Sequence, residues 1–114
     1  MNLNKVVEEI VENNEWLNGI VDIREGDVFE GLERREAYRT YTRCRSIKEL
    51  YDKVRNLDGV FVYKNLIFCS SYHYGVFVYH VSNPKNYIEH LSIWCIPYKE
   101  FAQIVKQLLN KYSK

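Results

Sequence analysis

Proline and glycine are scarce in this chain, which has two prolines and five glycines among its 114 residues. Neither residue clusters into a tract, so the sequence contains no flexible or extended linker of the kind that joins two domains. No internal repeat or low-complexity segment is present either. A chain of this length can bury a hydrophobic core without disulfides or metals, and we expect one domain that spans residues 1–114.

Cysteine is also scarce. The three cysteines, Cys44, Cys69 and Cys95, form no Cys-x-x-Cys pair, a pattern typical of reduced thiols in a cytoplasm. We expect Cys69 and Cys95 to be buried as small hydrophobic residues. Zinc prefers thiolate and imidazole ligands, but the spacing of the cysteines and the three histidines supplies no close chelating pair. The sequence therefore predicts no metal site and no cofactor.

Long uncharged apolar runs are absent, and the first residues lack the apolar core of a signal peptide. We therefore expect a soluble cytoplasmic protein without a membrane segment. An excess of one charge is missing as well, because 16 basic and 15 acidic residues leave a net charge of +1. A dedicated polyanion-binding protein often has a basic balance, so this near-neutrality disfavours binding over the whole surface and leaves a local basic patch open.

The charges that are present are segregated along the chain. Residues 1–33 carry a net charge of −7, whereas residues 34–55 carry +5. Five of the seven arginines lie within residues 34–45, interleaved with two tyrosines. Threonine, tyrosine and cysteine favour a strand in this segment, and the alternation of a strand places one row of residues on a common face. This arginine row consists of Arg35, Arg39, Tyr41, Arg43 and Arg45.

The arginine row has two interpretations. Guanidinium groups can bind phosphates while a tyrosine stacks on a base, which predicts a groove for single-stranded RNA or DNA. Alternatively, the row is an edge strand protected from aggregation by its charges, or its arginines pair with carboxylates of the acidic first third, within one subunit or across a dimer. The carboxylates expected to pair across a hairpin are Asp22, Glu25, Asp27, Glu30 and Glu33. We favour ion pairing, because the chain has no second basic element and no RNA-binding motif.

Hydrophobic periodicity predicts an α+β fold. Ser46 and Glu49 match the capping-box pattern at the start of the middle of three helical segments. Between residues 60 and 96, β-rich runs are separated by turns short enough to reverse the chain, as in an antiparallel meander. We expect three amphipathic helices and an antiparallel sheet of about five to six strands, in the order α-β-β-α-β-β-β-β-α. The helices cover 4–18, 47–57 and 98–112, and the strands cover 20–24, 34–45, 60–63, 66–69, 76–81 and 87–96.

Several strands of the meander are apolar on both faces, so both faces of the sheet must be covered. If the helices lie mainly on one side, the Val/Phe/Tyr surface opposite them needs a second subunit, and a closed two-fold dimer is the commonest arrangement. We therefore predict a non-enzymatic homodimeric interaction protein, which could also bind a protein partner. Binding of single-stranded nucleic acid through the arginine row is the alternative function.

A small nuclease is a third hypothesis. Polar residues, among them His73, collect in the turn 69–75 between two apolar strands. Acid–base cleavage of a phosphodiester would draw on Ser70, Ser71, His73, His80 or His90, with Glu36 and an arginine. The chain contains no nucleophile elbow, phosphate-binding glycine loop or metalloprotease helix. We therefore expect no enzymatic activity and assign no catalytic residue.

The chain as a whole resembles one family. Its richness in tyrosine, isoleucine and lysine, its strand Arg-Thr-Tyr-Thr-Arg-Cys-Arg over 39–45 and its run Phe-Val-Tyr-His-Val over 77–81 are similar to the small proteins of rudiviruses. These are rod-shaped viruses of hyperthermophilic archaea. The resemblance implies a viral protein in the cytoplasm of an infected archaeon, where intracellular disulfides occur, so a pairing of cysteines stays open. It carries over no activity and no functional residue.

Overall fold

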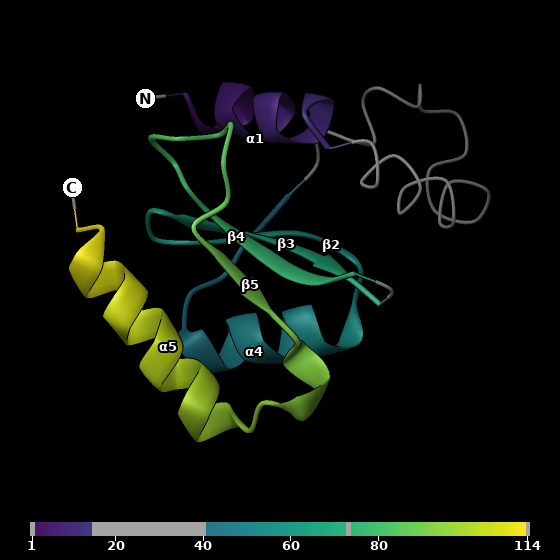
Figure 1. Cartoon of the computed structure of the whole chain (residues 1–114), viewed down its shortest axis with the longest axis vertical. Coiled ribbons are helices and arrows are strands. Elements are labelled where there is room, and N and C mark those ends of the chain that lie inside the picture. Colours follow the sequence, from purple (N-terminus) through teal and green to yellow (C-terminus); the bar gives the residue numbers. More distant parts are fainter. Residues whose placement is uncertain (1, 15–40, 73, 114) are drawn as a thin grey trace.

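The protein has three layers, with α1 on one side of a sheet and α4 with α5 on the other (Figure 1). The computed structural model describes residues 2–14, 41–72 and 74–113. Within these ranges the chain forms three α-helices and a five-stranded sheet, which confirms the predicted α+β class. The elements are α1 (Leu3–Glu12), β1 (Thr42–Arg43), α4 (Ile47–Asn56), β2 (Gly59–Tyr63), β3 (Leu66–Ser71), β4 (Gly75–His80), β5 (Glu89–Leu91), a 3-10 helix (Ile93–Cys95) and α5 (Tyr98–Lys111).

The strands lie side by side in chain order, from β1 at one edge to β5 at the other. β2, β3, β4 and β5 pair antiparallel, as the meander pattern predicted. β1, however, runs parallel to β2, so the prediction of a purely antiparallel sheet is wrong. The cause is the connection, because the ten-residue helix α4 carries the chain back along the sheet, and a crossover of this kind produces a parallel neighbour. The expected strand over 20–24 lies outside the described residues.

α4, the middle of the three predicted helices, begins directly after Ser46, as the capping-box pattern predicted. Ser46 Oγ accepts the backbone N–H of Glu49 at 3.1 Å, which satisfies one of the free donors in the first turn of α4. The Glu49 carboxylate reaches back past Ser46 and accepts the N–H of Arg45 at 3.1 Å. Together these bonds fix the direction in which the chain leaves β1 and enters α4.

The first helix is shorter than the periodicity predicted, because α1 ends at Glu12 instead of residue 18. Asn14 turns back on the helix, and its Nδ2 donates to the carbonyl of Ile10 at 2.6 Å. Asparagine competes in this way with the hydrogen bonds of a helix and favours its end. Asn14 Oδ1 also accepts the hydroxyl of Tyr79 at 3.0 Å, so the end of α1 is tied to β4.

The last predicted strand is also shorter than expected. Of residues 87–96, only β5 is a strand, and it is followed by the 3-10 helix at Ile93–Cys95. Pro97, which stands directly before α5, has no N–H to donate to a sheet ladder. The backbone N–H groups of Cys95 and Ile96 bond instead to carbonyls three residues earlier, which is the pattern of a 3-10 turn.

Both faces of the sheet are covered, as the two-sided apolar strands predicted. Because helices lie on both sides, the condition under which the sequence called for a second subunit, a sheet face opposite all the helices, is not met in the described part of the chain. On one face, α1 packs its apolar stripe onto β2, β3 and β4. On the other face, α4 and α5 enclose a larger cluster with Phe68 and Phe101 near its centre, their ring centroids 6.2 Å apart. β3 lies between these layers and is buried along its whole length. The α1 side contains Val7, Ile10, Val11, Val60, Val62, Ile67, Cys69 and Tyr79.

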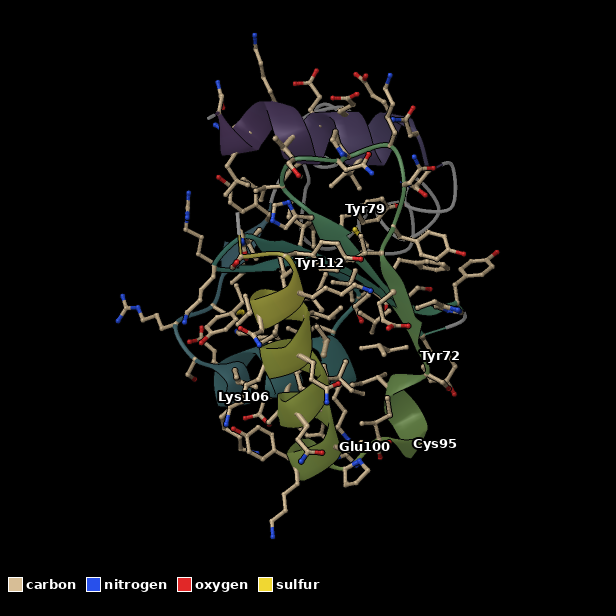
Figure 2. All side chains as sticks on the ribbon, turned by 60° about the vertical axis from the view of Figure 1, so that its left-hand side comes forward. Tyr72, Tyr79, Cys95, Glu100, Lys106 and Tyr112 are labelled. Atoms are coloured by element: carbon tan, nitrogen blue, oxygen red, sulfur yellow. The ribbon has the colours of Figure 1, made fainter. Side chains whose placement is uncertain are left out.

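His80 fastens the carboxyl end of α5 to the sheet. Its Nδ1 accepts the backbone N–H of Ser82 at 3.1 Å, so the ring proton lies on Nε2, which donates to the Tyr112 carbonyl at 2.9 Å. Asn65 Nδ2 donates to the same carbonyl at 2.8 Å. Figure 2 shows Tyr112 where α5 reaches the sheet. A carbonyl at a helix end, which has no partner within its own helix, is therefore held by two side chains of the sheet.

We expect the substitution His80→Ala to lower the free energy of unfolding by about 1–3 kcal/mol, because buried hydrogen-bonding groups lose their partner. Urea denaturation followed by circular dichroism measures this change. Tyr112→Phe is the matched control, since it keeps both the ring and the main-chain carbonyl, and we expect it to change stability little. Equal stability of the wild type and His80→Ala would contradict the role given to His80.

Candidate functional site

The structure describes three residues of the arginine row, since Arg35 and Arg39 lie outside the described residues. Tyr41 is half-buried and packs against the cluster beneath α1, and the Arg43 guanidinium lies 6.0 Å from the centre of its ring. Arg43 and Arg45 are exposed, and neither is paired with a carboxylate of the described ranges. The carboxylates at positions 22–33, which were expected to pair with the row, also lie outside those ranges. The ion-pairing interpretation therefore stays a prediction.

The histidines of the described residues do not converge. His80 belongs to the α5 side of the sheet, where its ring nitrogens are occupied by Ser82 and Tyr112. His90 lies opposite Phe77 in the register of β4 and β5, and the two rings are stacked on the α1 side. Two rings on opposite faces of one sheet cannot act on one substrate. His73 lies outside the described residues, so the arrangement offers no support to the nuclease hypothesis.

Four rings form an aromatic cluster on the α1 side of β4 and β5: Phe77, Tyr79, Tyr87 and His90. Phe77 and His90 are stacked, with ring centroids 4.2 Å apart and an interplanar angle of 9°. The Tyr87 ring stands edge-on to Phe77 at 5.0 Å and lies 6.4 Å from both Tyr79 and His90. Tyr79 is buried, and Figure 2 shows it between the sheet and α1, whereas Tyr87 is 52% exposed. The cluster thus has a buried base and an open surface.

Gly75, the first residue of β4, allows His90 and Leu91 of β5 to approach closely. His90 Nε2 lies 2.7 Å from the carbonyl of Tyr74, and Tyr74 itself is 56% exposed beside the cluster. Gly75 adopts a φ of +86°, and a Cβ there would lie 2.7 Å from the Leu91 carbonyl oxygen and 3.1 Å from His90 Nε2. Only glycine tolerates both this backbone conformation and this close approach. The aromatic cluster was not predicted, because the alternation of residues within one strand does not show which residues of the next strand lie opposite them.

Few charges lie beside the aromatic cluster on its own strands. The loop before β5 carries one exposed lysine, Lys85, whereas Glu89 of β5 pairs with Val78 and therefore lies on the opposite face of the sheet. Glu89 Oε1 accepts the backbone N–H of His90 at 3.2 Å, so this donor of the outermost strand is already occupied. The surface therefore presents ring faces and hydroxyls, and it lacks the basic excess that a polyanion requires.

The cysteines are free thiols in different surroundings. Cys44 and Cys69 are buried, whereas Cys95 is exposed, so the expectation of a buried Cys95 is wrong. That expectation assumed that Cys95 belongs to the strand predicted over 87–96. Cys95 lies instead on the 3-10 helix outside the sheet (Figure 2). Burial raises the pKa of the Cys69 thiol far above its usual range, and burial with the charge of Glu49 raises the pKa of Cys44.

Known proteins supply no assignment for these features. Comparison of the chain with family models, curated proteins and solved structures finds no match. In the described part of the chain, no helix has the length and apolar character needed to cross a membrane. The described histidine, cysteine and acidic side chains include no group of three arranged to hold a metal ion. The rudiviral origin and the cytoplasmic location stay predictions.

Thiol labelling tests the surroundings of the cysteines. We expect one thiol per native chain to react rapidly with a thiol-reactive dye at neutral pH, because a buried thiol with a raised pKa forms little thiolate. All three should react in denaturant. Cys95→Ser should remove the rapid reaction, and Cys44→Ser, the matched control, should retain it. A rapid phase that survives in Cys95→Ser would contradict the burial of the other two.

Gly75→Ala should lower the free energy of unfolding by about 1–3 kcal/mol, because alanine is strained at this backbone conformation and meets the Leu91 carbonyl. We also expect amide NMR signals of His90 and Phe77 to shift, since the His90 ring must move. Gln107→Ala, at an exposed position of α5, is the control and should stay within about 0.5 kcal/mol of the wild type. A Gly75→Ala protein as stable as the control would argue against the close packing described.

Proposed function

We propose that the protein is a non-enzymatic interaction protein that forms a homodimer through the aromatic cluster. The observation that supports this proposal is the stack of Phe77 and His90 beneath the exposed Tyr87 ring. Aromatic residues are enriched at the centres of protein interfaces, because a ring contributes a large contact area with little loss of side-chain entropy. The rings of this cluster are already held by their neighbours, so they lose still less side-chain entropy on association.

Charge favours a second copy of the chain as the partner. A net charge of +1 causes little electrostatic repulsion between two copies of the chain, and the loop beside the cluster carries a single exposed lysine, Lys85. Tyrosine hydroxyls both donate and accept hydrogen bonds, so the surface can be complementary to itself across a two-fold axis. The backbone of β5 contributes less, since Glu89 occupies the His90 N–H.

The expected contact extends beyond the rings. A stable dimer buries about 800 Å² on each partner, which is more than these few partly exposed rings supply. Two neighbouring segments would complete it: Tyr74 in the turn before β4, and the loop 81–88, whose Val81 packs against the α1 side of the core. The aromatic cluster would then form the centre of the interface, and these polar segments its rim.

Sedimentation velocity over a range of protein concentrations tests the homodimer. We expect a monomer–dimer equilibrium for the wild type and a Kd at least about tenfold higher for Tyr87→Ser, because a central ring is lost from the interface. Tyr98→Ser is the matched control, since Tyr98 is also partly exposed but packs against Tyr51 in the layer of α4 and α5. A wild type that remains monomeric at every concentration would overturn the proposal.

Binding of single-stranded nucleic acid is a second candidate function, supported by the exposed Arg43 and Arg45 beside Tyr41. Fluorescence anisotropy of a labelled single-stranded oligonucleotide at several salt concentrations measures it. Each phosphate contact on a single strand contributes about −0.7 to the slope of log K against log salt. Arg43→Ala with Arg45→Ala should therefore flatten the slope by about 1.4. If no binding is detected at low salt, this candidate is rejected.

A further inference from the structure

A small cavity lies between the carboxyl end of α4 and the end of β3, outside the aromatic cluster. It has a volume of about 40 Å³ and is lined by residues 54–58 and 70–72. Ser70 and Ser71 are 2% and 3% exposed and form its interior wall, whereas Leu57 and Tyr72 are 47% and 66% exposed and form its rim. The cavity is therefore open at one side and polar at depth.

The wall of this cavity includes backbone carbonyls at the end of α4 that lack a donor within the helix. The last helical bond of α4 joins the Leu57 N–H to the Lys53 carbonyl, so the carbonyls of residues 54–56 have no donor within the helix. Ser70 Oγ donates to the first of them, that of Val54, at 2.8 Å. Among the described residues, none donates to the carbonyls of Arg55 and Asn56.

Asp58 adds a negative charge to this wall. Its Oδ1 accepts the backbone N–H of Tyr72 at 2.9 Å, and its second oxygen has no donor within the described ranges. The carboxyl end of a helix is itself electronegative. The nearest basic side chain on the wall, Arg55, is engaged elsewhere, because its Nη1 donates to the Tyr51 hydroxyl at 3.2 Å and its guanidinium lies 5.7 Å from the centre of that ring.

We propose that this cavity binds one ammonium group, with Asp58 as its counter-ion. An ammonium group has only donors, which matches the helix-end carbonyls that lack a donor, and its positive charge complements the Asp58 carboxylate. The cavity has room for at least one group of the size of a water molecule, and an ammonium group is of that size. A guanidinium group spreads its charge over a planar fork and therefore matches a single carboxylate oxygen and helix-end carbonyls less well than a compact ammonium group does. The exposed Tyr72 ring at the rim adds a face that attracts cations.

This ammonium site is independent of the homodimer, because its residues take no part in the aromatic cluster. Two sources can supply the group: the free ammonium ion, or the side chain of a lysine on a polypeptide. A lysine would place its aliphatic stem against Leu57 and Tyr72 and its head group at Asp58. Both sources present the same ammonium group, and they differ only in the aliphatic chain that a lysine adds.

Amide NMR spectra of the full chain test the site through titration with three probes at constant ionic strength: ammonium chloride, acetyl-lysine methylamide and acetyl-arginine methylamide. We expect saturable shifts of the Leu57, Asp58 and Tyr72 amide signals with millimolar Kd for one or both of the first two probes, and none for the third. Ammonium alone would identify the free ion as the source, and the lysine compound would identify a polypeptide side chain.

Asp58→Asn provides the decisive variant. The amide oxygen can still accept the Tyr72 N–H, so the fold should be kept while the charge is lost, and we expect the Kd to rise at least about tenfold. Glu100→Gln, which removes an exposed carboxylate of α5 outside the cavity, is the control and should leave the Kd unchanged. Shifts that are equal for all three probes, absent for all three, or unaltered in Asp58→Asn would overturn the proposal.

Discussion

The complete burial of β3 is the constraint on which the rest of the structure depends. All six residues of this strand are buried, and because successive side chains point to opposite faces, each face needs a layer of its own. α1 supplies one layer, and α4 with α5 supplies the other. The strand changes from apolar to polar at Ser70 and Ser71, where it meets the end of α4. This change is what places a polar cavity at the margin of the core.

Local sequence patterns predicted the elements that are determined by residues close together in the chain. The capping box at Ser46 predicted the start of α4, and the short turn 64–65 predicted the antiparallel pairing of β2 with β3. The direction of β1 could not be read in this way, because it depends on where a crossover helix returns the chain. The early end of α1 has a local cause in Asn14, but the apolar periodicity continues beyond it and concealed the signal.

The functional surfaces were harder to predict, because they depend on pairing between distant segments. The stack of Phe77 on His90 follows from the register of β4 with β5, and the close approach of β5 to β4 at Gly75 leaves no room for a Cβ. Sequence alone does not distinguish His80 from His90, yet His80 is buried and holds the end of α5, whereas His90 lies on an exposed surface. Only the arginine row had a local pattern, and the structure describes Tyr41, Arg43 and Arg45 of it.

The short outer strand β5 has a consequence for how the protein behaves when it is crowded. Amyloid fibres grow when identical chains add strand upon strand to an open sheet edge, and long, flat edges with free N–H groups are the ones that template this growth. At β5 only three residues are available, and the N–H of His90 is occupied by Glu89. A native molecule therefore offers few free N–H groups to an added strand at this edge. The Glu89 carboxylate thus helps to prevent fibre growth from the folded state.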